Sequence, residues 1–507
     1  MAEKHGELLR GLSTAGKSPL FQGRFGRMFR NLPSAQFGKT EHENIRNLEQ
    51  LGRKMTASFD RPKDGKDDEE SGIPALYTYF GQFVDHDITF DPMSSLIKHN
   101  DPNALVDFRN PALDMDNVYG RGPNDQPYMY DTPMTFLLGD KISGAHHSAR
   151  DLPRNSKGRA LIGDPRNDEN SIVSQLQGLF LHFHNRLVSH HKGATFSEIQ
   201  QLMRFHYQYV ILNDFLPRIV SAKVLEDLKT DGHYDHSKLK YYHWKNDPFM
   251  PIEFSVAAYR LGHSMVRPGY RLNDSRDSLL AIFPDRRSHG LTGFRPMGHN
   301  RAIDWGRFID IDDRSYDGNH AVRKRRLQFA YRLDTSLVNP LGHLPRPQVV
   351  TDKPIVLAAR NLLRGWSLGL PSGQDVARAM GITPLPDEEI LIGKGVDNPG
   401  RMQNIVQTAG RVFADNCPLW TYILAEAMHN MVSVEIPVKE KGTLVTTPQL
   451  GPVGGRIVAE VFLGLMFGDD DSYLQINPLW QPKSVTPERK FALKDIVHYA
   501  LGYGPPL

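Results

Sequence analysis

The stretch GQFVDHDITF at 81–90 places an amide, an imidazole and two carboxylates in an otherwise apolar segment. If this segment is helical, Gln82 and His86 lie four residues apart and project from one face. Asp85 and Asp87 then project about 100° to either side of His86, so the two carboxylates diverge. Burying unpaired charges in such an aromatic-rich segment is costly. We therefore predict that His86 and Gln82 face a reaction space and that each carboxylate faces a partner of its own.

Two further segments carry side chains that suit the same chemistry. In PRNDEN, Arg166 and Glu169 are three residues apart at the start of a long amphipathic segment, which puts them on one side of it. In YRLGH, His263 follows an apolar helical turn, and Gly262 leaves room for a bulky group. A neutral imidazole beside a guanidinium suits heterolysis of a peroxide bond, since one moves the proton and the other stabilises negative charge. A histidine on the other side suits ligation of a haem iron.

The elements that must position these groups are mostly helical. Apolar residues recur at helical spacing from Ser171 onward and again through 196–216, where Pro217 is expected to end the helix. Strand-like alternation is scarce and short. The pattern predicts a mainly α-helical fold with long irregular loops. Further helices are predicted near 74–90, 254–265, 414–431, 455–467 and 488–501, and long loops at 266–300 and 394–402.

Length and charge limit the function classes. The 507 residues contain no internal repeat and no linker, which predicts one large domain over 71–507. Residues 1–70 are polar and broken by Gly and Pro, so we expect an extended arm with little regular structure, partly wrapped on the body. Lys+Arg 61 against Asp+Glu 58 gives a net charge of +3, and no basic run alternates with aromatics as in a nucleic-acid-binding face. The run RKRR at 323–326 is interpreted as solvated surface.

Cysteine usage and apolar runs bear on the compartment. Cys417 is the only cysteine, so no intrachain disulfide forms, and we interpret it as an inert buried thiol. The charged start MAEKHGELLRGL lacks the apolar core of a signal peptide, and no apolar stretch reaches the ~20 residues of a membrane span. The expectation is a soluble protein, cytoplasmic or exported by a route independent of a signal peptide. The sequence does not indicate an oligomeric state.

Five segments in the order GQFVDHD, NPALDMDNVYG, PRNDE, YRLGH and RNLLRGWSLGLP resemble the animal-type haem peroxidases of the peroxidase–cyclooxygenase superfamily. The resemblance runs from about residue 70 to the end and is strongest to bacterial members, which lack disulfides and appended domains. It implies a haem b enzyme that cleaves hydrogen peroxide and oxidises halides, thiocyanate or phenolic donors. It also implies a bound calcium ion.

Site roles follow from the resemblance by position. His86 corresponds to the distal acid–base residue, Arg166 to the distal arginine, and Gln82 to the neighbour that orients water or a halide. Asp85 and Glu169 correspond to the carboxylates that form ester links to haem methyl groups.

The resemblance also assigns the proximal side and the cation. His263 corresponds to the iron ligand, and Asn361 to the asparagine that hydrogen-bonds its far ring nitrogen and so fixes the tautomer. Hard oxygen ligands from a loop are those that calcium favours. The calcium ligands implied are Asp87, Asn110, Ala112, Asp114 and Asp116.

One departure from the family pattern bears on the substrate. Asn170 follows Glu169 where some members have a methionine that forms a third, sulfonium link to haem. At most two ester links are therefore expected. This argues against chloride as a substrate and favours iodide, bromide, thiocyanate or phenols.

The main alternative is a fatty-acid oxygenase of the same superfamily, similar to the cyclooxygenases and alpha-dioxygenases. Those enzymes have a radical-forming tyrosine three residues before the proximal histidine, where this chain has Arg260. Tyr259 is one residue further back and is expected to point about 100° away on a regular helix. YYHW at 241–244 is similar to the oxygenase signature but is predicted to lie in a loop.

Two alternatives belong to other classes. A haem-binding sensor without turnover would need His263 but neither His86 nor Arg166. A zinc protein would use His182 and His184, which lie two residues apart and would diverge on a helix. The peroxidase interpretation is preferred over both.

Overall fold

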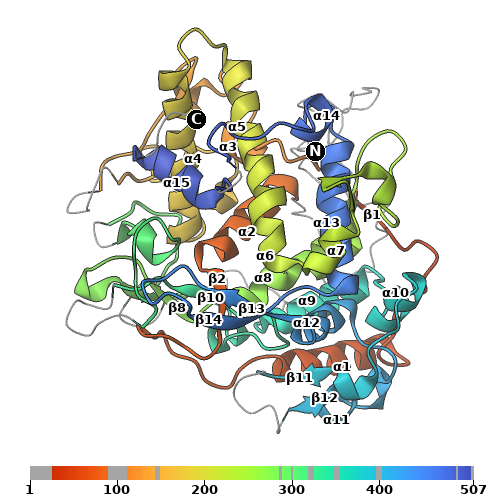
Figure 1. Cartoon of the computed structure of the whole chain (residues 1–507). Coiled ribbons are helices and arrows are strands. Elements are labelled where there is room, and N and C mark those ends of the chain that lie inside the picture. Colours follow the sequence, from red (N-terminus) through yellow and green to blue (C-terminus); the bar gives the residue numbers. More distant parts are fainter. Residues whose placement is uncertain are drawn as a thin grey trace, which may run out of the picture.

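Helices make up most of the body, and short strand pairs lie among them (Figure 1). This computed structural model describes residues 25–89, 111–142, 149–284, 288–298, 301–317, 325–345, 354–394, 402–486 and 489–503. The helices are α1 Glu41–Lys54, α2 Leu76–Ile88, α3 Asp116–Tyr119, α4 Ser171–His190, α5 Phe196–Val210, α6 Leu216–Ile219, α7 Ala222–Glu226, α8 Gly262–Met265, α9 Leu357–Ser367, α10 Gly373–Ala379, α11 Ile405–Ala409, α12 Leu419–Met428, α13 Pro452–Phe467, α14 Tyr473–Ile476 and α15 Leu493–Leu501. The mainly α-helical fold class is confirmed.

The strands of the described residues form only two-stranded pairs. β1 Phe25–Gly26 pairs in parallel with β7 Met250–Pro251. The antiparallel pairs are β2 Glu70–Pro74 with β10 Phe329–Tyr331, β3 Tyr130–Thr132 with β4 Thr135–Phe136, β5 Lys229–Thr230 with β6 His233–Tyr234, β8 Gly269–Arg271 with β9 Leu279–Ala281, β11 Leu391–Ile392 with β12 Gln403–Asn404, and β13 Met431–Glu435 with β14 Leu444–Pro448. Within the described ranges, no helix combines the length and apolar character that a membrane crossing requires.

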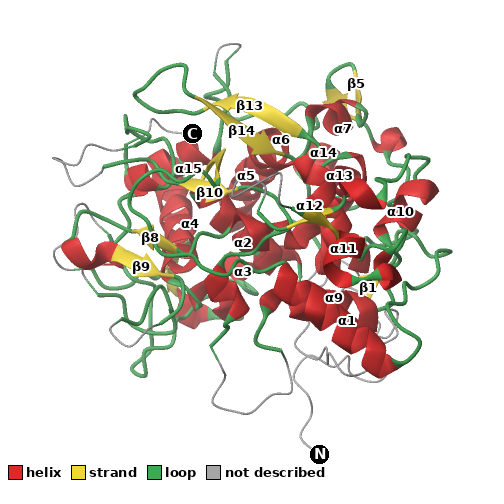
Figure 2. Cartoon of the chain, turned by 90° about the horizontal axis from the view of Figure 1, so that it is seen from below, coloured by secondary structure: helices red, strands yellow, loops and turns green. Residues whose placement is uncertain are grey.

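Helix α2 lies in the middle of the body, against α4 on one side and α8 on another (Figure 2). Its apolar side chains are fully buried, and Phe83 stacks on Phe180 of α4 with ring centroids 4.7 Å apart. An aromatic pair of this kind adds about 1 kcal/mol beyond the burial of its two rings. The polar residues of α2 therefore project from a helix whose position is fixed by its core contacts.

The start of α4 is fixed by side-chain caps. The Asn170 carboxamide oxygen accepts the backbone N–H groups of Ile172 and Val173, at 3.1 and 3.0 Å. Directly before it, a 3₁₀ turn spans Pro165–Asp168, and the Asp164 carboxylate caps that turn by accepting the Arg166 N–H. Such caps satisfy the donors that a helix start leaves open. Turn and helix together place residues 166–170 beside α2.

The expectation of little regular structure before residue 70 is wrong for α1. Thr40 and Glu43 form a capping box at its start, and Leu48 and Leu51 are fully buried. The helix lies along α9, and a Cβ added to Gly52 would come within 2.5 Å of the Ala359 backbone nitrogen (Figure 2). The capping-box signal and the apolar spacing were both present in the sequence. Residues 25–70 pack on the body through α1 and through the pairing of β1 with β7, and residues 1–24 lie outside the described residues.

The prediction that Pro217 ends the helix of 196–216 is wrong. After α5 the chain passes through a π-helical segment, Ile211–Phe215, and continues directly into α6, where Pro217 occupies the first turn. The Leu216 N–H bonds the Ile211 carbonyl five residues back, so the helix continues through the junction although Pro217 itself has no N–H to donate. The predicted helix over 254–265 is also irregular: a π-helical segment, Glu253–Ala257, precedes a 3₁₀ turn, Ala258–Leu261, and then α8.

Buried ion pairs tie β2 and β10 to the body. Glu70 is ion-paired with both Arg267 and Arg326, and all three side chains are at most 1% exposed. The interpretation of 323–326 as solvated surface is therefore wrong for Arg326, because a carboxylate buried beside it compensates its charge. Cys417 is fully buried, which agrees with its interpretation as a core thiol.

Candidate functional site

A cavity of about 270 Å³ lies between α2 and the irregular segment 253–265. Helix α2 contributes Gln82, Asp85 and His86, and the opposite segment contributes Arg260 and His263. Gln82 and His86 thus share one face of α2, as their spacing predicts. Apolar side chains of Phe215, Leu261, Met265 and Val266 complete much of the wall.

His86 is buried with one ring nitrogen bonded and the other toward the cavity side. Its Nδ1 lies 2.7 Å from Asn167 Oδ1, and its Nε2 lies 3.9 Å from Glu169 Oε1. Burial, together with the nearby charge of Arg166, lowers the pKa of His86 to about 4. The imidazole is therefore neutral near pH 7 and has one nitrogen with a lone pair, as a general base requires.

The structure places Arg166 differently from the expected position beside the His86 ring. Its NH2 lies 2.8 Å from Asp164 Oδ2 and donates to the backbone oxygens of His86 and Thr89, at 3.0 and 2.6 Å. Within the described part of the chain, Arg166 is not among the side chains that line the cavity. The buried Asp164 carboxylate and the open carbonyls at the end of α2 hold the guanidinium there.

Gln82, Glu169 and Asn170 form a hydrogen-bonded chain, of which Gln82 and Glu169 line the cavity. Asn170 Nδ2 donates to Gln82 Oε1 at 3.2 Å, and Gln82 Nε2 donates to Glu169 Oε1. Burial raises the pKa of Glu169 to about 7, although the charge of Arg166 opposes the shift. Asn170 therefore both caps α4 and orients the Gln82 amide. The family pattern indicates only that a methionine is absent at this position, and neither contact of Asn170 is predicted from it.

His263 is paired with Asn361. The Asn361 amide nitrogen lies 2.8 Å from His263 Nδ1, which leaves Nε2 for the cavity. Burial and the charge of Arg260 lower the pKa of His263 to about 3. A Cβ added to Gly262 would meet no atom within 4 Å, so space is open beside the histidine, as predicted.

Arg260 and Tyr259 also line the cavity, and the sequence analysis did not predict this for either. The Arg260 Nε is buried and has no hydrogen-bond acceptor among the described residues. Tyr259 donates its hydroxyl to the Gly81 carbonyl at 3.1 Å. The expectation that Tyr259 points away is wrong because residues 258–261 form a 3₁₀ turn, not a regular α-helix. The three-residue spacing of Arg260 and His263 was the available signal, since residues three apart lie on one side of a helical segment.

Asp87 points away from this cavity into a cluster with Asp114 and Asp116. One carboxylate oxygen of each lies within 4.8 Å of the others. Burial, followed by the charges of Asp114 and Asp116, raises the pKa of Asp87 well above its usual range. Ala112 is buried in the same loop, and Asn110 lies outside the described residues. Closely spaced hard oxygens that repel one another without a cation suit calcium.

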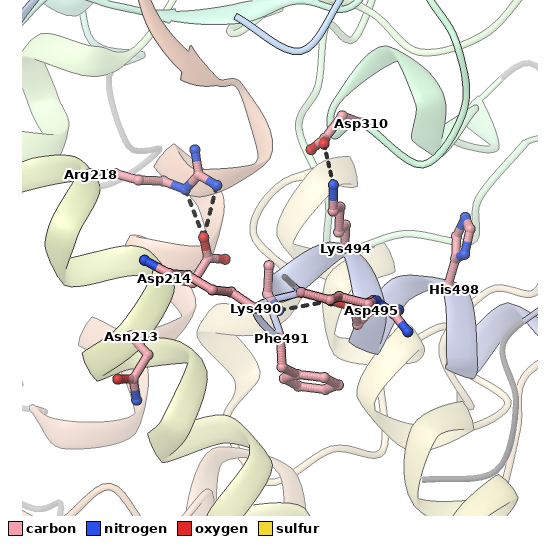
Figure 3. A pocket seen from close by; sticks show the side chains of 11 residues that line it. Asn213, Asp214, Arg218, Asp310, Lys490, Phe491, Lys494, Asp495 and His498 are labelled. Carbon is pink, nitrogen blue, oxygen red and sulfur yellow. Dashed lines mark hydrogen bonds and ion pairs between the residues drawn. The ribbon is translucent and has the colours of Figure 1, made fainter. Parts of the chain in front are cut away.

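A larger hollow, of about 560 Å³, lies beside the start of α15 (Figure 3). Three of its cations are ion-paired: Arg218 with Asp214, Lys494 with Asp310, and Arg489 with Asp495. Lys490 also lines the hollow. Most of the charge there is thus compensated, and the smaller cavity, which contains the two histidines, is the better candidate site.

The zinc alternative does not fit the histidines on α4. Both ring nitrogens of His184 are engaged, Nδ1 with the Tyr119 hydroxyl at 2.9 Å and Nε2 with the Met134 carbonyl at 2.8 Å. A ligand nitrogen must be free of such a bond.

Comparisons with known proteins agree with this geometry. A family model described as animal haem peroxidase matches residues 111–398. That segment contains Arg166, Glu169, His263 and Asn361, whereas α2 precedes it.

Thyroid peroxidase from Rattus norvegicus is 26% identical over 275 residues, which is 52% of this chain but 28% of the rat protein. Peroxidase A from Dictyostelium discoideum has a similar fold over 97% of this chain and 96% of its own, with a TM-score of 0.62 and 17% identity. The Oryza sativa fatty acid alpha-dioxygenase matches with a TM-score of 0.53 and 14% identity, over 93% of this chain and 78% of its own. The chain spans just over a quarter of the length of the rat relative, and the two solved structures show similarity of fold alone.

Proposed function

The chain belongs to the animal haem peroxidase family, and on that premise we propose that it uses haem b to reduce hydrogen peroxide and oxidise small anionic or phenolic donors. The observation that carries the proposal is the position of two neutral imidazoles, His86 and His263, on two walls of one cavity. One imidazole suits a metal ligand and the other a general base.

The residues of the cavity fit a haem. The unpartnered Arg260 Nε suits a carboxylate carried into the cavity, because a buried guanidinium nitrogen without an acceptor is costly. His263 supplies an imidazole whose far nitrogen already meets the Asn361 amide. In the structure the amide nitrogen of Asn361 faces Nδ1. Ligation through Nε2 requires the reversed amide, whose oxygen would accept the Nδ1 proton. Bound haem supplies the iron-centred oxidation. The residues of this chain bind the haem and transfer the proton.

His86 is the residue that transfers the peroxide proton in this proposal. Its Nε2 accepts the proton from the inner oxygen of the peroxide and returns it to the outer oxygen as the O–O bond breaks. The Gln82 amide, oriented by Asn170, contributes a polar group beside that position. Arg166 adds positive charge from its place at the end of α2, where it already lowers the pKa of His86. Stabilisation of charge on the leaving oxygen by Arg166 would require its guanidinium to turn away from Asp164.

Asp85 and Glu169 are proposed to form the ester links. Both line the cavity, and Glu169 is a carboxyl whose pKa is raised to about 7. Extraction with acidified organic solvent tests this point. Haem that stays with the wild-type protein and is extracted from the double variant carrying Asp85→Asn and Glu169→Gln supports the links, and haem that leaves the wild type contradicts them.

The Asp87, Asp114 and Asp116 cluster is proposed to bind calcium, with Ala112 and Asn110 as further ligands. The support is the 4.8 Å spacing of the three carboxylate oxygens. Because Asp87 and His86 are adjacent on α2, an ion there would also hold the end of the helix that carries the base.

The proposed class of electron-donor substrate rests on Asn170. Its side chain caps α4 and bonds Gln82, so this position has no methionine to make a third haem link. We therefore propose iodide, bromide, thiocyanate or phenols as donors. The second candidate is fatty-acid oxygenation, favoured by the observation that Tyr259 lines the cavity.

One experiment separates the two candidates. The haem-loaded protein is mixed with hydrogen peroxide and then with iodide, bromide, thiocyanate or guaiacol, and in parallel with palmitic acid and oxygen but no peroxide. Donor oxidation that requires peroxide, and is lost in His86→Gln but kept in a His190→Gln surface control, supports the peroxidase. Oxygen uptake with palmitic acid and no peroxide would contradict the peroxidase function and support the oxygenase.

A further inference from the structure

His86, Asn167 and Gln177 form a buried hydrogen-bonded row behind the cavity. His86 Nδ1 lies 2.7 Å from Asn167 Oδ1, and Asn167 Nδ2 donates to Gln177 Oε1 at 2.8 Å. Asn167 and Gln177 are fully buried, and His86 is 5% exposed. The three side chains come from α2, from the 3₁₀ turn and from α4.

The direction of this row decides the tautomer of His86. A carboxamide oxygen only accepts hydrogen bonds, so His86 Nδ1 carries the ring proton when it meets Asn167 Oδ1. Nε2 then has its lone pair available on the cavity side. The opposite direction would put the proton on Nε2, where it blocks proton acceptance.

The turn that carries Asn167 is held from both ends. Asp164 caps its start, and Asp168 at its end pairs with Arg154 at 2.6 Å. Adjacent residues in this turn diverge: Arg166 reaches the carbonyls at the end of α2, while Asn167 reaches the ring of His86. One turn therefore contacts both the backbone and the side chain of His86.

We propose that Asn167, held by Gln177, is a positioning residue that keeps His86 in the tautomer able to accept the proton of the peroxide. The inference rests on the proposed peroxidase function and adds to it a residue that acts only through His86. Partners of this kind behind a functional histidine typically change activity by about 10- to 100-fold.

The first test reads the tautomer without turnover. Nitrogen-15 NMR of the full chain, loaded with diamagnetic zinc protoporphyrin and assigned with His86→Gln, locates the ring proton of His86. A proton on Nδ1 in the wild type, lost from that position in Asn167→Leu, supports the inference. A proton on Nε2 in the wild type overturns it, whatever the enzyme's activity.

The second test uses the haem-loaded protein. Cyanide binds ferric haem from HCN, so its association requires a base to take the proton. At pH 7, Asn167→Leu should slow cyanide association and the reaction with peroxide by about 10- to 100-fold. Asn167→Asp, which keeps an acceptor for Nδ1, should stay within about threefold of the wild type.

Controls separate positioning from folding. Asn44→Leu removes another buried asparagine, on α1 and remote from the cavity, and should leave both rates unchanged. Equal rates in Asn167→Leu and the wild type, or equal losses in Asn167→Leu and Asn167→Asp, would overturn the inference. If the wild-type protein binds haem but reacts with neither cyanide nor peroxide, the proposed peroxidase function is wrong.

Discussion

Replacing Asp87 with asparagine changes the stability of the protein with a sign that depends on whether a cation is bound. Asp87 is fully buried, and its carboxylate approaches those of Asp114 and Asp116 to within 4.8 Å. Asparagine keeps the shape and an oxygen that can accept the Met115 N–H, which Asp87 Oδ2 accepts at 3.2 Å. The substitution therefore removes a charge with little change in packing.

The size of the effect follows from Coulomb's law. Two unit charges 4.8 Å apart repel by about 3.5 kcal/mol at an effective dielectric constant of about 20. Protonation of Asp87, whose pKa is raised, removes part of that repulsion. Without calcium we expect Asp87→Asn to be more stable than the wild type by about 2 kcal/mol. Calcium at 100 times its Kd stabilises the wild type by about 2.7 kcal/mol, and the variant loses most of that gain.

Urea unfolding at pH 7.5, followed by tryptophan fluorescence in EGTA and in calcium chloride, measures both values. Asp131→Asn, an exposed aspartate on β3, is the matched control and should behave like the wild type in both solutions. The order of stability should reverse between EGTA and calcium. A variant that is destabilised by the same amount in both solutions would refute the reasoning, because the three carboxylates would then hold no cation.

Three further predictions concern single side chains. His86→Ala should slow the first reaction with peroxide by about 10²-fold or more while haem stays bound, as stopped-flow absorbance would record; an unchanged rate would take the base role from His86. Asn361→Leu should weaken haem binding by about 10- to 100-fold in a competition titration against apomyoglobin, because His263 loses its partner; equal affinity would make that bond irrelevant to ligation. Burial lowers the pKa of His206 from 6.5 to about 4, so the unfolded chain takes up its proton first as the pH falls. The wild type should therefore lose about 3 kcal/mol of stability between pH 6.5 and 4 that His206→Phe keeps, and parallel pH profiles of the two proteins would contradict this.

The parts of the fold predicted from the sequence are those governed by side-chain periodicity. The 3.6-residue period fixes which residues of α2 share a face, so Gln82 and His86 fall on the cavity and Asp87 on the opposite flank. The same period located α4 and its first residue, Ser171, which the structure also caps through Asn170.

Irregular backbone explains most of what was missed. A π-helical segment followed by a 3₁₀ turn rotates residues 253–261 relative to a regular helix, and this brings Tyr259 and Arg260 into the cavity. Helical periodicity cannot predict such a change, since packing against other segments determines it. One such contact is the hydrogen bond from Tyr259 to the Gly81 carbonyl.

Side-chain contacts that no sequence pattern indicates explain the other positions that were not predicted. Arg166 turns to Asp164 and to the end of α2, and Asn167 meets Gln177 and His86, although the two residues are adjacent. The spacing of residues in the sequence does not show which of these two neighbouring side chains faces His86. Arg326 is buried because Glu70, which lies 256 positions earlier, enters the same space.

Diffraction from crystals of the haem-loaded protein at the iron absorption edge locates the iron relative to the two histidines. We expect one anomalous peak in the cavity between α2 and residues 253–265, bonded to His263 Nε2, with His86 Nε2 on the open side. An iron peak elsewhere, or one bonded to His86 in place of His263, would contradict it.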